Sequence, residues 1–170
     1  MHKEVNYTDV LKQAMEQLGK GGAFLTTCYD GKINTMTIGW GTAGILWSKP
    51  VLTVMVRYSR HTYNLIEKAG EFTVSFPQQG ELARELVICG TKSGRNIDKF
   101  DECGFKPVES FTVKTPCIDK CGIHFECKTI YKQAMEPGLI GDKVKDLFYR
   151  NNNDYHVVYY GEITRCHVND

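Results

Sequence analysis

Residues 23–38 read AFLTTCY-DG-KINTMTI, two short runs rich in β-branched and aromatic side chains on either side of Asp30-Gly31. An Asp-Gly pair between two such runs is typical of a two-residue β-hairpin turn, in which both turn residues have positive φ. The stretch therefore predicts two antiparallel strands, and it sets the expectation of a β-rich fold.

Other parts of the chain are also rich in β-branched and aromatic residues. Four more stretches are predicted strands: 51–57 (VLTVMVR, after Pro50), 71–76 (EFTVSF), 122–131 (GIHFECKTIY) and 154–168 (DYHVVYYGEITRCHV). Helical periodicity is found at 7–18, 61–70, 79–88, 94–102 and 139–149, the last as an insertion between two strands. Many short strands with a few helices between them favour a mainly β fold of the barrel type over a doubly wound sheet.

Length and composition exclude several classes of protein for this chain. A chain of 170 residues is predicted to form one domain over 1–170, and 42% hydrophobic with 24% charged residues excludes a disordered chain. The net charge of +1 gives no basic surface for nucleic acid or anionic lipid. The sequence contains no run of 18 or more apolar residues, so no membrane-spanning helix is predicted.

Seven cysteines, an odd number, and a first segment without an apolar h-region predict reduced thiols in a cytoplasmic protein. Cys117, Cys121 and Cys127 could supply three thiolates, with His124 as the nearest fourth ligand for structural zinc. His124 and Cys127 lie three residues apart on a predicted strand, however, and so point to opposite faces. We therefore expect buried thiols that pack as small hydrophobic groups, and no metal site.

The segment Gly39–Gly44 (GWGTAG) matches the G-x-G-x-x-G pattern of dinucleotide-binding proteins. That fingerprint also needs a helix that opens at the motif, whereas here ILWSKP and another strand follow. The pattern is better explained as a glycine-rich bend where the backbone passes close to a flat group or to another chain.

Three polar clusters indicate a ligand. The segment 34–37 (NTMT) combines small hydroxyls and an amide beside glycines, which suits the edge of a flat heteroaromatic ring. The segment 57–62 (RYSRHT) places two guanidiniums and two hydroxyls at a predicted helix start, as phosphate sites do. Residues 91–95 with Lys99 form a second cationic loop. Solvated side chains would explain each cluster alone; together the three favour an anionic ligand that carries a ring.

The order and spacing of several segments resemble the flavin reductase-like, FMN-binding split-barrel family, in particular its flavoredoxin-type members. The resemblance covers about residues 7–165. It is carried by Asn34–Trp40, Pro50 before VLTVMV, Arg57–Thr62, Gly70–Ser75, Cys89-Gly90 with Ser93–Arg95, Asp98–Phe100 and Gly161–Ile163.

The resemblance implies a split β-barrel that forms a homodimer, with FMN near the dimer interface. The residues implied to line the isoalloxazine are Asn34, Thr35, Met36, Thr37 and Trp40. Those implied to hold the phosphate are Arg57, Ser59, Arg60 and Thr62, with Ser93 and Lys99 nearby. Which arginine points inward stays open, as does whether the segment 139–149 covers the flavin. The apolar residues Ile45, Leu46 and Trp47 are hard to bury in a small barrel and also favour a dimer.

The implied function is that of an FMN-binding oxidoreductase that passes electrons from NAD(P)H through bound flavin to free flavin or to a protein partner. Two alternatives remain: a flavoredoxin-like electron carrier with little nicotinamide activity, and a non-redox thiol or metal structural module. No catalytic residue is assigned, because the flavin does the redox chemistry and hydride arrival at the ring needs no general base.

Overall fold

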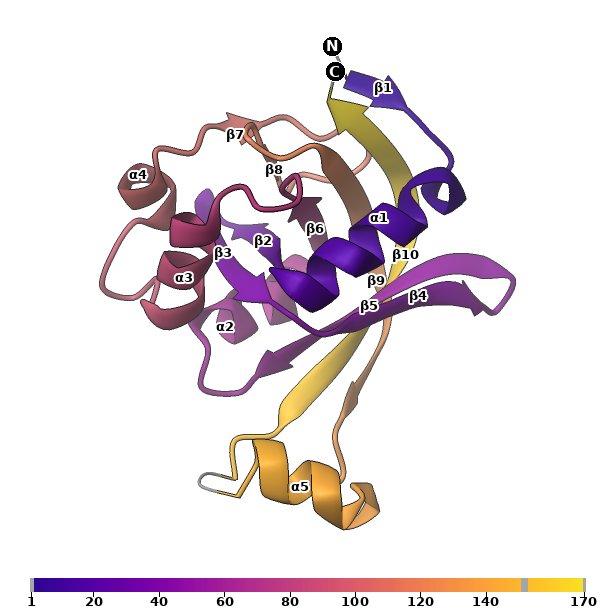
Figure 1. The fold of residues 1–170 in the computed structure, drawn as a ribbon, viewed down its shortest axis with the longest axis vertical. Coiled ribbons are helices and arrows are strands. Elements are labelled where there is room, and N and C mark those ends of the chain that lie inside the picture. Colours follow the sequence, from indigo (N-terminus) through magenta and orange to yellow (C-terminus); the bar gives the residue numbers. More distant parts are fainter. Residues whose placement is uncertain (1, 151–152, 170) are drawn as a thin grey trace.

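The structure, a computed structural model, describes residues 2–150 and 153–169 (Figure 1). Its strands are β1 (His2–Glu4), β2 (Ala23–Tyr29), β3 (Lys32–Ile38), β4 (Gly41–Leu46), β5 (Lys49–Arg57), β6 (Glu71–Phe76), β7 (Pro107–Val108), β8 (Cys117–Ile118), β9 (Ile123–Ala134) and β10 (His156–Asn169). Its helices are α1 (Tyr7–Lys20), α2 (His61–Ala69), α3 (Ala83–Thr91), α4 (Lys99–Cys103) and α5 (Asp142–Phe148), with a 3₁₀ turn at Pro137–Leu139. No described helix has the length and apolar character needed to cross a membrane.

One antiparallel sheet organises these elements, in the order β3-β2-β6-β9-β10-β5-β4, with β1 paired to β10. α1 lies across the sheet, α3 and α4 gather beside β3, and α5 stands apart at the far end of β9 and β10 (Figure 1). The prediction of a mainly β fold with a few helices is confirmed.

The hairpin predicted at Asp30-Gly31 forms as expected. Asp30 and Gly31 have φ of 51° and 71°, and Tyr29 pairs with Lys32 across the turn. The helix predicted over 7–18 also forms, as α1, with Ala14 and Leu18 buried against the sheet.

Two hydrophobic clusters support the fold. The larger one lies between the sheet and α1 and includes Leu25, Val54, Phe72, Phe125 and Tyr159. The smaller one fills the space between α3, α4 and β2, where the rings of Phe24, Phe100 and Phe105 meet edge to face. This second cluster fixes the position of α3 beside the end of β3, where the cavities described below open.

The interpretation of Gly39–Gly44 as a bend is wrong in part, because β4 begins at Gly41 and pairs with β5 along its whole length. A Cβ at Gly41 would lie 2.7 Å from the carbonyl oxygen of Thr53, so the close backbone approach is to β5. The β4–β5 turn uses Trp47 and Ser48, both with positive φ. Hairpin turns with positive φ usually contain Asn, Asp or Gly, so Trp47 and Ser48 did not mark this hairpin in the sequence.

Two predicted helix boundaries are also shifted. Leu82 has φ of 55°, so α3 begins only at Ala83 and runs to Thr91 rather than over 79–88. Asp98 accepts hydrogen bonds from the amides of Phe100 and Asp101, which starts α4 at Lys99 and leaves 94–98 outside the helix. The inserted helix expected at 139–149 is confirmed as α5.

Candidate functional site

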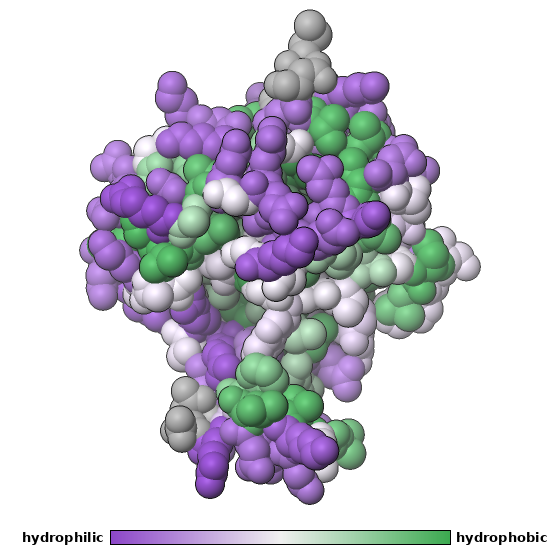
Figure 2. Space-filling view, viewed as in Figure 1, coloured by the Kyte–Doolittle hydropathy of each residue, from purple (hydrophilic) through white to green (hydrophobic). Residues whose placement is uncertain are grey.

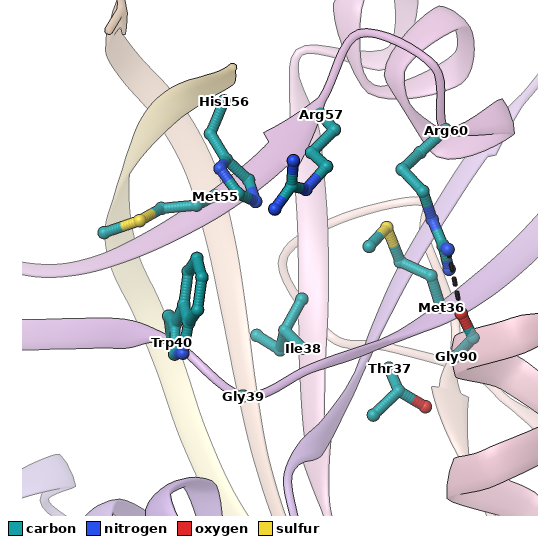
Figure 3. A pocket seen from close by; sticks show the side chains of 10 residues that line it. All are labelled: Met36, Thr37, Ile38, Gly39, Trp40, Met55, Arg57, Arg60, Gly90 and His156. Atoms are coloured by element: carbon teal, nitrogen blue, oxygen red, sulfur yellow. Dashed lines mark hydrogen bonds between the residues drawn. The ribbon is translucent and has the colours of Figure 1, made fainter. Parts of the chain in front are cut away.

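A cavity of about 220 Å³ opens where β3 and β5 both end (Figure 3). Its walls come from the end of β3, the β3–β4 connection, β5, the loop before α2, the end of α3 and the start of β10. The lining residues are Met36, Thr37, Ile38, Gly39, Trp40, Met55, Arg57, Arg60, Gly90 and His156. We call it the ring cavity.

The packing of α3 against β3 sets one wall of the ring cavity. The hydroxyl of Thr37 donates to the carbonyl oxygen of Leu86 at 2.6 Å. A Cβ at Gly90 would lie 3.4 Å from the Cβ of Thr37, which is van der Waals contact, so α3 packs closely on this wall. Trp40 forms the opposite wall and is 40% exposed, which leaves the cavity accessible from that side.

A second cavity, of about 180 Å³, adjoins the first, and Arg60 lines both. We call it the cationic cavity. It is formed by the loop after β5, the start of α2 and the connection between α3 and α4. The lining residues are Ser59, Arg60, His61, Thr62, Thr91, Lys92, Ser93, Gly94, Arg95 and Lys99.

Arg60 is held between the two cavities by the end of α3. Its guanidinium donates to the carbonyl oxygen of Gly90 at 2.8 Å (Figure 3). It also donates to the carbonyl oxygen of Cys89 at 3.3 Å. Burial, and then the positive charge of Arg57, lower the pKa of Arg60, while Asp154 acts in the opposite direction. The side chain remains a cation that bridges the two spaces.

Arg57 has a different environment. Its guanidinium donates to the carbonyl oxygens of Asp154 at 2.7 Å and Phe148 at 3.2 Å, and it lies 5.1 Å from the ring centre of Tyr149. It therefore ties the segment around α5 to the end of β5. Arg57 lines the ring cavity, and it is absent from the described residues that line the cationic one.

The remaining predicted residues fall into two groups. Met36, Thr37 and Trp40 line the ring cavity, and Ser59, Thr62, Ser93 and Lys99 line the cationic cavity. Asn34 and Thr35 are not among the described residues that line either one. The amide of Asn34 donates to Thr62 Oγ1 at 2.8 Å, and Thr35 Oγ1 donates to the carbonyl of Leu25.

Lys99 reaches the cationic cavity from inside the protein and is only 4% exposed. Its ammonium donates to the carbonyl oxygens of Thr35 and Cys89, both at 2.9 Å, and so joins β3 to α3. Burial lowers the pKa of Lys99 to about 8. At neutral pH the group keeps a positive charge beneath the cavity.

Among the lining residues that were not predicted to contact the ligand are Met55, Gly90, Arg95 and His156. His156 is 7% exposed, and its Nδ1 lies 2.7 Å from the hydroxyl of Tyr149. Burial and the nearby Arg57 lower the pKa of His156 to about 4, so its imidazole is neutral at pH 7. Arg95 completes the second cationic loop, and its guanidinium donates to the carbonyl of Ser59 at 3.1 Å. The alternation of β5 could have indicated Met55, whereas no local pattern marks His156.

The cysteines group differently from the set weighed in the sequence. All seven are free, and Cys127 lies in the larger core, away from the smaller cluster that contains Cys121. The potential ligand atoms that converge, within 4.8 Å of one another, are those of Cys117, His124 and His167. Both nitrogens of His124 are already engaged, Nδ1 with Ser75 Oγ at 3.0 Å and Nε2 with the carbonyl of Cys121 at 3.1 Å. These contacts explain the burial of His124 without an ion.

The chain is similar to known proteins. A family model described as a flavin reductase like domain matches residues 15–170. A protein of Archaeoglobus fulgidus is 35% identical over 99 residues, which is 58% of this chain and 55% of that protein. The chain thus spans about half the length of the curated relatives it matches.

Two of the solved structures that resemble this chain illustrate the match. Flavoredoxin from Methanosarcina acetivorans is 26% identical with a TM-score of 0.67, over 88% of this chain and 69% of that one. An FMN-binding domain of a flavin reductases-like enzyme from Shewanella baltica is 21% identical with a TM-score of 0.68, over 99% and 77%. The predicted split-barrel fold is confirmed, and the chain belongs to the flavin reductase-like family.

Proposed function

We propose that this chain binds FMN across the ring and cationic cavities and passes electrons from NAD(P)H through the flavin to free flavin or to a protein partner. The observation that carries the proposal is that Arg60 lines both cavities. One cavity offers aromatic and sulfur side chains for a flat ring, and the other offers cations and hydroxyls for a phosphate.

The groups in the cationic cavity fit a phosphate. α2 begins after Arg60 without a side-chain cap, and the first residues of the helix, His61 and Thr62, line the cavity. Helix N-termini favour anions through their amide groups and dipole. Arg60, Arg95 and the hydroxyl of Ser93 add charge-assisted and neutral donors of the kind that phosphate oxygens accept.

The groups in the ring cavity fit the isoalloxazine. Trp40 and the thioethers of Met36 and Met55 are polarizable surfaces for a planar ring. Bound FMN would supply the two-electron chemistry. The guanidinium of Arg57 contributes positive charge beside the ring, which favours the electron-rich reduced form. The neutral imidazole of His156 adds a polar contact without a competing charge.

The alternative function, a flavoredoxin-like carrier with little nicotinamide activity, is supported by the 26% identity to flavoredoxin. Both functions need FMN, and they differ in the rate at which a nicotinamide reduces it. The third possibility, a non-redox structural module, needs no flavin at all.

We also propose a homodimer in the cytoplasm. Ile45 and Trp47, on the β4–β5 hairpin, are 66% and 59% exposed, and Leu147 on α5 and Leu139 in the 3₁₀ turn before it are exposed as well. Apolar patches are visible at the hairpin and at the α5 end of the molecule (Figure 2). Exposed apolar groups of this size favour an interface. Seven free thiols fit a reducing compartment. Light scattering should give twice the 19.3 kDa chain mass; a monomer at micromolar concentration would contradict the dimer.

The test of function has two stages. Equilibrium dialysis should show one FMN bound per chain, and the absence of FMN uptake by folded protein would exclude both flavin functions. Stopped-flow mixing of the FMN-loaded protein with NADH and NADPH then separates them. Rapid bleaching of the flavin absorbance supports the reductase, whereas slow bleaching with both nucleotides favours the carrier.

A further inference from the structure

Asp154, just before β10, occupies donors of the cationic cavity. Its Oδ1 accepts the amide N–H of Ser59 at 3.2 Å, and its Oδ2 accepts the hydroxyl of Ser59 at 2.5 Å. Ser59 lines the cationic cavity, so an N–H and an O–H that suit a phosphate are taken by a carboxylate of the protein itself.

The charge of Asp154 also acts on the neighbouring cations. Burial and the charge of Arg57 lower the pKa of Arg60 and that of His156, and the negative charge of Asp154 opposes both shifts. Asp154 therefore partly offsets the positive charge of the guanidiniums that border the two cavities. A phosphate group adds up to two negative charges at the same place, and like charges this close repel each other.

The contact between Asp154 and Ser59 is connected to α5 through Arg57. The carbonyl oxygens of Asp154 and Phe148 both accept from Arg57, and the ring of Phe148 lies 4.9 Å from that of Trp40. Asp154 thus lies at the cationic cavity, and Phe148 lies at a wall of the ring cavity. If Asp154 moved away from Ser59, its link to the loop after β5 would be lost.

We propose that Asp154 determines the affinity for FMN. In the free protein it holds the loop after β5 through Ser59, and it must release Ser59 when the phosphate of FMN binds. The inference rests on the proposed function. Its consequence is that FMN binds less tightly than the donor set alone would allow, and so exchanges with the solution. An exchangeable flavin suits a reductase that hands reduced flavin to another protein better than a carrier that keeps it.

The test compares Asp154→Asn, which removes the charge and keeps the shape, with Asp146→Asn, which makes the same change at an exposed position of α5. We expect Asp154→Asn to tighten FMN binding and slow FMN release, each by about tenfold, a change of about 1.4 kcal/mol. Riboflavin, which has no phosphate, should bind within about twofold of wild type, and Asp146→Asn should change neither ligand. Flavin fluorescence measures all of these.

A second measurement needs no variant. Hydrogen exchange of wild-type peptides that cover 153–158 should be faster with FMN than with riboflavin at saturation, because only FMN displaces Asp154. Unchanged or weaker FMN binding by folded Asp154→Asn, or equal exchange with the two ligands, would overturn the inference while the proposed function stands. If wild type binds neither flavin, both are wrong.

Discussion

Replacement of Arg60 by alanine provides the sharpest test of the proposed flavin site. Arg60 is the guanidinium that both cavities share, so it is the side chain best placed to contact the phosphate of a flavin whose ring lies in the first cavity. A charge-assisted hydrogen bond contributes about 1.5–3 kcal/mol. Arg60→Ala should therefore weaken FMN binding by roughly ten- to a hundredfold, at about 1.4 kcal/mol per decade.

Riboflavin separates this contact from a general disturbance of the site. It lacks the phosphate, so its affinity should change little in Arg60→Ala, and the preference for FMN over riboflavin should narrow. Any structural damage from the lost hydrogen bonds to Gly90 and Cys89 would weaken both ligands together. Arg84→Ala is the matched control, because Arg84 is on α3 with a side chain that is 69% exposed.

Titration of both ligands by flavin fluorescence tests whether Arg60 contacts the phosphate. Arg57→Ala should preserve the preference for FMN over riboflavin better than Arg60→Ala, since Arg57 is tied to the α5 segment. An unchanged ratio of the two dissociation constants in Arg60→Ala would refute the phosphate assignment. The remaining cations of the 91–99 loop would then be the better candidates.

Three further outcomes are expected. Gly161→Ala should lower the free energy of unfolding by about 1–3 kcal/mol in urea denaturation, because its Cβ would overlap the ring of Phe72. Gly44→Ala, with open space around it, should not. His156 has a pKa of about 4 when folded against 6.5 in the unfolded chain, so the unfolded chain binds more protons between these values and stability falls as the pH drops from 6.5 to 4. His156→Gln should make that fall shallower, and an identical pH profile would count against the burial argument. Elemental analysis should find less than stoichiometric zinc, and zinc that resists chelators at one per chain would restore the metal hypothesis for Cys117.

Local signals predicted the fold well because most of the strands and turns here are specified locally. Asp30-Gly31 requires positive φ at both positions, and the hairpin that it predicts forms. The β4–β5 hairpin escaped notice because Trp47 and Ser48 adopt the same conformation without glycine or asparagine. Leu82 has the same effect at α3, where a positive φ delays the helix that the hydrophobic periodicity alone places earlier.

The site was less predictable than the fold because its walls come from distant parts of the chain. Runs such as 57–62 reveal that cations and hydroxyls are present, but not which of them share a space. Arg57 and Arg60 look equivalent in the sequence, yet one donates to carbonyls 91 and 97 residues away and the other to carbonyls 29 and 30 residues away. The β5–β10 pairing that sets His156 opposite Arg57 brings these residues together. A local pattern therefore indicates the chemistry of the ligand. The different roles of Arg57 and Arg60 depend instead on contacts with distant parts of the chain.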